Sequence, residues 1–217
     1  MKFAYWSIRG RGGPARLMFA YAGVEYENIE YVIGTEDWNR DKETLGFDFP
    51  NLPYLIDGDT KMTESWAIYR YLGRKFGLRP TTEKEEIACD MLEGVLMDTI
   101  RTFGTAAYSP DLVQKLDETR KDQLAKIKRI DQFLSGRDYI AGNKLTYVDF
   151  VLYETFDWQR LLFPDIMDET VNVKGFIKRF EGLAPITAHI SSKDYKKFPI
   201  LAPFAAWGGK DHDDRTW

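Results

Sequence analysis

Residues 49–65 read FPNLPYLIDGDTKMTES, and this stretch decides the fold class of the first part of the chain. Two runs of β-forming residues flank the sequence DGD at 57–59, which favours a tight hairpin because glycine tolerates the backbone angles that such a turn requires. Ser65 follows the hairpin and opens a pattern with helical spacing that ends at Gly77. The stretch therefore predicts two antiparallel strands followed by a helix.

The residues before this stretch predict a second unit, in which a helix connects two strands. The range 3–8 is a short apolar and aromatic run typical of a buried strand, and the range 26–32 alternates and is rich in β-forming residues. Between them, the glycine-rich turn 10–13 leads into Pro14, which suits the first turn of a helix, and Gly23 suits the end of that helix. A βαβ unit followed by a ββα unit predicts an α/β domain over residues 1–80.

The character of the sequence changes after a linker at 78–82. The ranges 83–107 and 112–134 have the spacing of long helices, with charged residues on the outside. The apolar residues expected to face inward on the first of these helices are Met91, Leu92, Val95 and Leu96. Because no strand pattern follows the linker, the sequence predicts an all-helical domain over 83–207.

Two further features concern the second half of the chain. Thr146 and Asp149 have the spacing of a capping box, directly before an apolar run that starts at Phe150, so we expect a helix to begin there. The last residues, 208–217, have the composition of a flexible tail, although Trp217 is able to dock on the protein.

Composition and charge exclude several classes of protein. The chain has 217 residues, 44% of them hydrophobic and 29% charged, which is ordinary for a globular protein with a sizeable core. The net charge of −4 is spread along the chain and gives no basic face for nucleic acid. Cys89 is the only cysteine, so no intrachain disulfide can form. With neither a secretory signal nor an apolar run long enough to cross a membrane, we expect a cytoplasmic protein.

Six short motifs follow one another along the chain. They are YWSIRG at 5–10, FPNLPYLIDG at 49–58, ESWAI at 64–68, AGNKLTYVDF at 141–150, FEGL at 180–183 and AWG at 206–208. Their order resembles that of the mu class of cytosolic glutathione S-transferases, and the resemblance extends from residue 1 to about residue 210.

This resemblance implies a fold and an activity. The fold is α/β followed by all-α: a thioredoxin-like domain that binds glutathione, then an all-helical domain that contributes the pocket for the electrophile. The activity is detoxification by transfer of the glutathione thiolate to small hydrophobic electrophiles. Glutathione serves as co-substrate, and neither a cofactor nor a metal is expected.

The chemistry requires a thiolate, and Tyr5 is the residue predicted to stabilise it. The thiol pKa of glutathione lies near 8.5, so a mostly ionised thiol at pH 7 needs a pKa lower by about two units, or about 2.7 kcal/mol. A hydrogen bond to a charged group contributes about 1.5–3 kcal/mol. Tyr5 ends the first strand, before the helix that Pro14 opens, and the resemblance implies that its phenol donates to the sulfur. The alternative is that Tyr5 is a core aromatic residue.

The resemblance also implies how the rest of glutathione binds. A cis bond before Pro53 presents the backbone of Leu52, which pairs with the cysteinyl part as an added strand does. Ser65, at a helix N-terminus, receives the α-carboxylate of the γ-glutamyl group. Glu64 stands where the mu class usually has Gln, and its carboxylate pairs with the γ-glutamyl ammonium. The alternatives are a strand-start proline and a serine that serves only as a helix cap.

Other site residues follow from the same resemblance. Trp38 and Lys42 match residues that hold the glycyl carboxylate, and Asp98 matches one that reaches across a dimer interface to the partner's glutathione. The predicted glutathione site comprises Tyr5, Trp6, Trp38, Lys42, Asn51, Leu52, Pro53, Glu64, Ser65 and Asp98.

The electrophile pocket and the dimer are predicted in the same way. Trp6, Tyr108 and Phe204 are expected to line the pocket, with the Tyr108 phenol donating to charge that builds on the substrate. Phe49 matches an aromatic residue that inserts between the partner's first two long helices, which implies a homodimer. Arg9 and Arg16 are expected to be structural.

Several alternatives remain open from the sequence. The loop at 34–38 is shorter than its mu-class equivalent and lacks its arginine, so a neighbouring class such as sigma fits as well. Two alternatives to an enzyme are a storage protein for hydrophobic ligands and a structural protein of the lens-crystallin kind. Tyr5, Lys42, Asn51 and Ser65 favour the enzyme, because a structural protein has no chemical need for them. The physiological electrophile does not follow from the sequence, since apolar pockets discriminate weakly.

Overall fold

A four-stranded sheet forms the centre of the first domain in the computed structural model, which describes residues 1–215. The strands, in the spatial order β2-β1-β3-β4, are β2 (Glu27–Tyr31), β1 (Lys2–Trp6), β3 (Tyr54–Asp57) and β4 (Thr60–Thr63). β1 runs parallel to β2 and antiparallel to β3, and β3 and β4 form the predicted hairpin. This order is that of a thioredoxin-like sheet.

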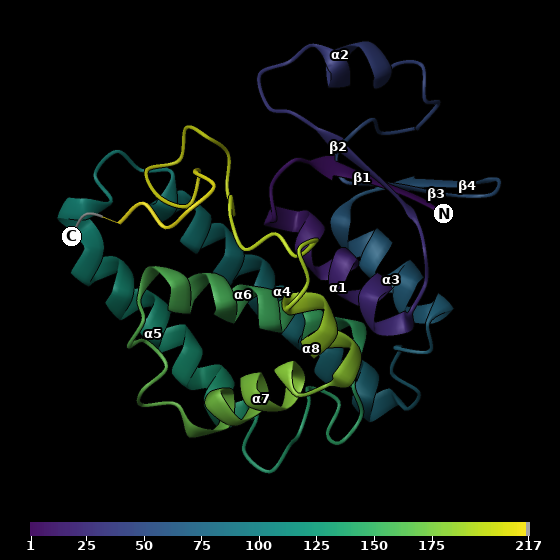
Figure 1. Cartoon of the computed structure of the whole chain (residues 1–217). Helices are drawn as coiled ribbons and strands as arrows, with labels where there is room; N and C mark the ends of the chain where they lie inside the picture. The colour runs from purple at the N-terminus through teal and green to yellow at the C-terminus, as the bar shows by residue number, and fades with distance from the viewer. Residues whose placement is uncertain (216–217) are drawn as a thin grey trace.

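Two helices cover one face of this sheet, and a third lies apart from it (Figure 1). They are α1 (Gly13–Ala22), α3 (Ser65–Lys75) and the short α2 (Asp37–Asp41). α1 follows a single 3-10 turn (Gly10–Gly12) and ends at Gly23, whose φ of 62° lies in the left-handed region that favours glycine at a helix end. The sequence predicted α1 and α3 but not α2.

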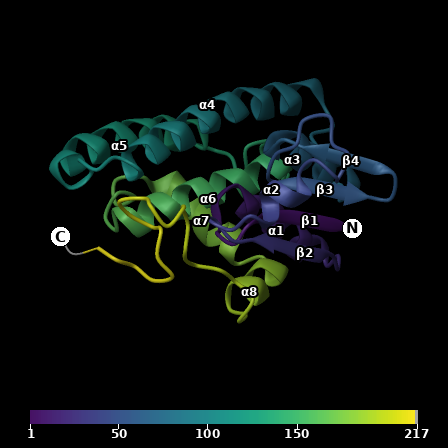
Figure 2. The ribbon, with the colours of Figure 1, turned by 90° about the horizontal axis from the view of Figure 1, so that it is seen from above.

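The second domain is all-helical over the residues that the structure describes. Its helices are α4 (Glu83–Ala107), α5 (Leu116–Phe133), α6 (Tyr147–Leu162), α7 (Val171–Glu181) and α8 (Ala184–Ile190). α6 lies at the centre and is buried along almost its whole length, whereas α4 and α5 run side by side along one flank (Figure 2). The predicted fold class, α/β followed by all-α, is confirmed.

The predicted cap at the start of α6 is also confirmed. The buried carboxylate of Asp149 accepts hydrogen bonds from the amide of Thr146 at 2.7 Å and from the hydroxyl of Thr146 at 2.9 Å. It also accepts from the amide of Ile140 at 2.9 Å, which ties the preceding loop to the helix. The sequence fragment around 141–150 therefore anchors the central helix.

The structure corrects two expectations for α4 and α5. Met91 and Val95 are 53% and 42% exposed, whereas Leu92 and Leu96 are buried as predicted. A helical period shows that apolar residues recur on one face of a helix. It does not show whether another part of the same chain packs on that face. α5 begins at Leu116 rather than near residue 112, because residues Val113–Lys115 form a separate 3-10 turn.

The segment after α8 folds back across the second domain. Gly208 and Gly209 are buried, and the carbonyl of Gly208 accepts from the amides of Ile200 and Leu201 at 2.8 and 2.9 Å. The predicted tail at 208–217 thus begins inside the packed structure, and the Arg215 side chain donates to the carbonyl of Leu162 at 3.3 Å. The docking predicted for Trp217 lies outside the described residues.

Candidate active site at the domain interface

A cleft of about 460 Å³ lies between the first domain and α4. Its lining comes from the end of β1 and the following turn, from α3, from one face of α4, and from α6 and the C-terminal segment. The lining residues are Tyr5, Ile8, Gly10, Arg11, Trp66, Met97, Asp98, Ile100, Arg101, Phe103, Gly104, Thr105, Tyr108, Trp158 and Leu201. The cleft therefore brings together Tyr5, Asp98 and Tyr108 of the predicted site.

Tyr5 packs against the glycine-rich turn that follows β1. A Cβ at Gly10 would lie 2.9 Å from the Tyr5 hydroxyl oxygen, and one at Gly12 would lie 2.8 Å from Cδ1 of its ring. Only glycine allows so close an approach of the backbone, and Gly10 also has a positive φ of 33°. The turn thus holds the phenol at the wall of the cleft with 6% of the residue exposed.

The surroundings of Tyr5 keep its phenol protonated. Burial raises the pKa of Tyr5 above its ordinary value, and the backbone amide and positive charge of Arg11 offset only part of that rise. A neutral phenol is a hydrogen-bond donor. Tyr5 can therefore donate to an anion in the cleft throughout the neutral pH range.

Arg11 is a cleft residue that we did not predict. Its carbonyl accepts from the Tyr69 hydroxyl at 2.5 Å, and its guanidinium donates to the Ser65 hydroxyl at 3.4 Å. The guanidinium therefore contacts the start of α3, and its charge also acts on the Tyr5 phenol. An arginine enclosed by glycines at 10–13 was the available signal, because such a turn exposes whatever side chain it carries.

The start of α3 has an unusual backbone. Glu64, the residue before the helix, has φ 68° and ψ 113°, which makes it the one residue other than glycine with a positive φ in the part of the chain described. Its carboxylate accepts from the Asn51 side chain at 3.0 Å, and the Asn51 oxygen accepts from the amide of Leu52 at 2.9 Å. The Leu52–Pro53 bond is cis, as expected. Asn51, Leu52 and Glu64 thus form one connected group beside Ser65.

Trp38 and Lys42 lie on α2 and directly after it. The indole of Trp38 packs edge-on against Tyr31, with ring centroids 5.4 Å apart, and nearly parallel to Tyr54 at 6.2 Å. Lys42 is half-buried and forms no ion pair with any residue in 1–215. The pair belongs to a part of the first domain separate from the cleft lining.

Tyr108 directly follows α4 and lines the cleft. Its hydroxyl oxygen accepts from the amide of Ala202 at 2.9 Å, and its ring packs on Phe204 with centroids 5.5 Å apart. Phe204 is 74% exposed and lies beside the cleft rather than in its lining. Trp6, also expected in the pocket, is half-buried at the end of β1 and does not belong to the lining.

The remaining wall of the cleft is one face of α4. The spacing of the lining positions between Met97 and Tyr108 is that of neighbours on one side of a helix. Helical steps of three and four residues back from Tyr108 would have predicted most of these lining residues from the sequence. Asp98 lies on the edge of this face and pairs with Arg101 at 3.1 Å.

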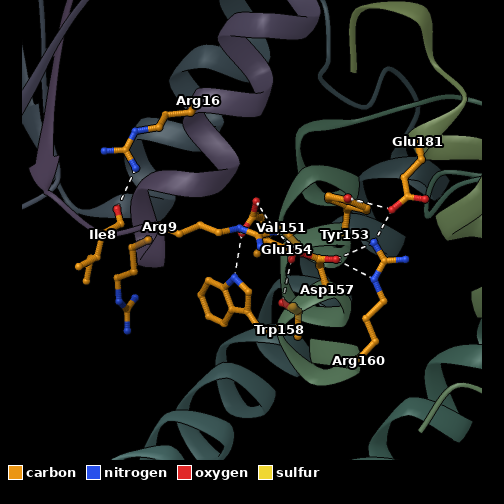
Figure 3. A network of polar contacts seen from close by, with 12 residues as sticks. Ile8, Arg9, Arg16, Val151, Tyr153, Glu154, Asp157, Trp158, Arg160 and Glu181 are labelled. Atoms are coloured by element: carbon orange, nitrogen blue, oxygen red, sulfur yellow. Dashed lines mark hydrogen bonds and ion pairs between the residues drawn. The ribbon is translucent and has the colours of Figure 1, made fainter. Parts of the chain in front are cut away.

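A buried ion network connects the cleft to the base of the glycine-rich turn (Figure 3). Arg9, 2% exposed, donates to Glu154 at 2.8 Å and pairs with Asp157 at 2.5 Å. Burial alone would lower the pKa of Arg9, but these carboxylates raise it well above its ordinary value. Glu154 also accepts from the indole of Trp158, a cleft residue, at 2.9 Å. The network therefore fixes a wall of the cleft and the turn under Tyr5 together.

The same network continues along α6 to Glu181, the last residue of α7. Asp157 pairs with Arg160, which also binds Glu181, and Tyr153 donates to Glu181 at 3.0 Å. On the other side, Arg16 donates to the carbonyl of Ile8 at 2.9 Å. These contacts fit the structural roles expected of Arg9 and Arg16. Within residues 1–215 we find neither a group of His, Cys, Asp and Glu suited to a metal nor a helix able to span a membrane.

Comparison with known proteins gives consistent results for both domains. The family model for the glutathione S-transferase N-terminal domain matches residues 1–74, and the model for the C-terminal domain matches residues 97–193. Glutathione S-transferase Mu 2 of Rattus norvegicus is 42% identical over 216 residues, covering 97% of this chain and 99% of the relative. Glutathione S-transferase Mu 1 of Bos taurus is 41% identical with the same coverage.

Solved structures agree with these sequence relatives. The glutathione S-transferase Blo t 8 superposes with a TM-score of 0.89 at 36% identity, covering 96% of this chain and 100% of that one. The Pi-class enzyme of Onchocerca volvulus superposes with a TM-score of 0.83 at 26% identity, covering 94% of this chain and 98% of that one.

Proposed function

This chain belongs to the glutathione S-transferase family, and on this basis we propose which residues bind each part of glutathione and which assist the reaction. The activity is transfer of glutathione to electrophiles, with glutathione as co-substrate, and the two sequence relatives quoted above are Mu 2 and Mu 1 glutathione S-transferases. The observation that carries the proposal is the position of Tyr5, a protonated phenol at the wall of a cleft that both domains form.

Tyr5 donates a hydrogen bond to the glutathione sulfur and favours the thiolate. The required reduction of the thiol pKa, about two units, equals about 2.7 kcal/mol, and one hydrogen bond to a charged group contributes about 1.5–3 kcal/mol. The Arg11 guanidinium, which donates to Ser65 and whose charge acts on Tyr5, favours the same anion. The thiolate then attacks an electrophile held against α4.

Glu64 and Ser65 bind the γ-glutamyl end. The positive φ of Glu64 is a costly conformation for a residue with a side chain, and such strain tends to occur where a ligand site requires it. The carboxylate of Glu64 pairs with the ligand's ammonium, while the free N–H groups at the start of α3 and the Ser65 hydroxyl receive its carboxylate.

Leu52 and Asn51 bind the cysteinyl part. The amide of Leu52 already donates to the Asn51 side chain at 2.9 Å. Binding exchanges this bond for one from the Leu52 amide to the peptide, which frees the Asn51 side-chain oxygen to accept a hydrogen bond from glutathione. At the other end of the tripeptide, Trp38 and Lys42 receive the glycyl carboxylate, Trp38 as a directed N–H donor and Lys42 as a charge.

Tyr108 assists the electrophile. Its hydroxyl oxygen already accepts from the Ala202 amide at 2.9 Å, so its proton remains available to donate into the cleft. The apolar side chains of the lining suit a small hydrophobic substrate, with Met97, Ile100 and Leu201 on the α4 side and the C-terminal side.

A homodimer completes the site. Phe49 is 76% exposed in a loop of the first domain, and a groove of about 350 Å³ lies between α4 and α5. Asp98 lines both this groove and the cleft, so a partner's Phe49 seated there places Asp98 at the junction of the interface and a site. The groove is lined by Met91, Leu92, Val95, Asp98, Thr99, Lys126, Arg129, Ile130 and Phe133.

Two assays test the function. We expect the protein to bind immobilised glutathione, to elute with free glutathione, and to conjugate glutathione to a chlorinated nitroaromatic compound. A protein that is retained but does not accelerate conjugation with that compound or with an epoxide or enone would be a binding protein. That outcome would contradict the roles proposed for Tyr5 and Tyr108.

A further inference from the structure

The short helix α2 is held to the first domain by few contacts. Residues 32–53 leave the sheet after β2, pass through α2 and return at β3, and α2 stands away from the main body of the molecule (Figure 1). The polar contacts between this excursion and the sheet include one from the Lys61 side chain to the carbonyl of Leu45 at 2.9 Å and one from the Thr63 hydroxyl to the carbonyl of Phe49 at 2.8 Å. Both lie after α2, so neither fixes α2 itself.

Tyr31 is the residue of the sheet whose side chain donates a hydrogen bond to α2. It ends β2 and is 6% exposed, and its hydroxyl donates to the Asp41 carboxylate at 3.1 Å. Asp41 is the last residue of α2 and precedes Lys42. The ring of Tyr31 also forms a T-shaped contact with the Trp38 indole, with ring centroids 5.4 Å apart. Tyr31 therefore contacts α2 at two residues, Trp38 and Asp41.

Tyr54 reinforces this contact from β3. Its hydroxyl lies 3.4 Å from that of Tyr31, and its ring is nearly parallel to the Trp38 indole at 6.2 Å. Because Tyr31 uses its proton on Asp41, Tyr54 supplies the proton of the Tyr54–Tyr31 bond, and the chain of donors ends at the carboxylate. Burial, together with Tyr54 and Asp41, raises the pKa of Tyr31 far above its ordinary value, so Tyr31 stays a donor at any pH at which the enzyme works.

We propose that Tyr31 is a positioning residue for the glycyl end of glutathione, acting through Asp41 and Trp38 to hold α2 in its binding position. The proposal rests on the function proposed above for Trp38 and Lys42. Loss of the Tyr31 hydroxyl lets α2 move, which weakens the binding of the glycyl carboxylate by Trp38 and Lys42. The sulfur site at Tyr5 is built by β1 and the turn at 10–13, so chemistry at saturating glutathione is unchanged.

The test compares two peptides that differ only at the glycyl end. Glutathione and γ-glutamylcysteine share the γ-glutamyl and cysteinyl parts, but the second lacks glycine. We expect Tyr31→Phe to weaken glutathione binding about fivefold in isothermal titration, the size of one net hydrogen bond, and to leave γ-glutamylcysteine binding unchanged. KM for glutathione should rise in proportion, with kcat and the titration midpoint of the bound thiol unchanged.

A matched control is available in the same domain. Tyr71 on α3 donates to the Asp57 carboxylate at 2.6 Å, a bond of the same kind that is remote from α2. Tyr71→Phe should leave the affinity for both peptides unchanged. If Tyr31→Phe does not fold, Asp41→Asn removes the charge of the same acceptor and takes its place in the comparison.

Lys42→Ala separates failure of this inference from failure of the proposed site. If Lys42→Ala weakens glutathione alone while Tyr31→Phe changes neither peptide, the inference is wrong and the glycyl site stands. If Tyr31→Phe weakens both peptides equally, the residue only stabilises the domain, and the inference is wrong again. If Lys42→Ala does not distinguish the two peptides, the glycyl assignment itself is wrong, and the inference falls with it.

Discussion

Removing the Phe49 ring should separate the two subunits of the proposed dimer. Phe49 is 76% exposed in the single chain, and full burial of an exposed Phe contributes about 1.5–3 kcal/mol, so burial of the exposed part contributes about 1.1–2.3 kcal/mol. A two-fold interface makes this contact twice, which gives about 2.3–4.6 kcal/mol per dimer. Phe49→Ser should therefore weaken dimerisation about 50- to 2,000-fold.

Light scattering over a dilution series, with activity measured on the same samples, gives the dissociation constant. Phe204→Ser is the control for oligomeric state, because Phe204 is equally exposed, at 74%, but lies beside Tyr108 rather than near the groove. Activity should fall with the fraction of dimer, since Asp98 lines both the groove and the cleft. A wild-type chain that is monomeric and fully active at every concentration would refute both the Phe49 contact and the shared role of Asp98.

Three further predictions concern single residues. Glu64→Ala should weaken glutathione binding by about 1.5–3 kcal/mol in isothermal titration while kcat changes little, because a charge-assisted bond to the ammonium is lost far from the sulfur; equal affinities would show that Glu64 serves only the local fold. Gly12→Ala should lower kcat about 10- to 100-fold, since its new Cβ would meet the Tyr5 ring at 2.8 Å and displace the phenol, and steady-state kinetics showing unchanged turnover would contradict the packing argument. Cys89 is fully buried, and burial raises the pKa of its thiol to about 12. An aromatic disulfide reagent should therefore label Cys89 at pH 8 only after unfolding in guanidinium, and rapid labelling of the native protein would contradict its burial.

Local signals explain what the sequence could predict. The hairpin at 57–59, the end of α1 at Gly23 and the cap at Asp149 each depend on a few neighbouring residues, and each is present in the structure. The cis bond before Pro53 came instead from the family motif that contains it. Such features can be predicted from the sequence because the residue that determines the local backbone conformation lies within a few positions of it.

Features that depend on distant parts of the chain were missed. Met91 and Val95 have the spacing of core residues, and only the assembled fold shows that no helix of the described chain covers them. α2 has five residues and no side-chain cap, and the sheet residue that donates to it is Tyr31, ten residues from Asp41 in the sequence. Arg11 became a site residue only because the turn that carries it meets the start of α3.

The central claim is that the Tyr5 phenol stabilises the glutathione thiolate, and the ultraviolet absorbance of the bound thiolate as a function of pH tests it directly. The burial of Tyr5 keeps its own ionisation above the range of this titration, so the midpoint reports the bound thiol. In the wild-type enzyme we expect a midpoint about two units below 8.5, and in Tyr5→Phe a midpoint about one to two units higher than in the wild type, with glutathione still bound. An identical midpoint in the two proteins, each saturated with glutathione, would contradict the account and remove Tyr5 from the mechanism.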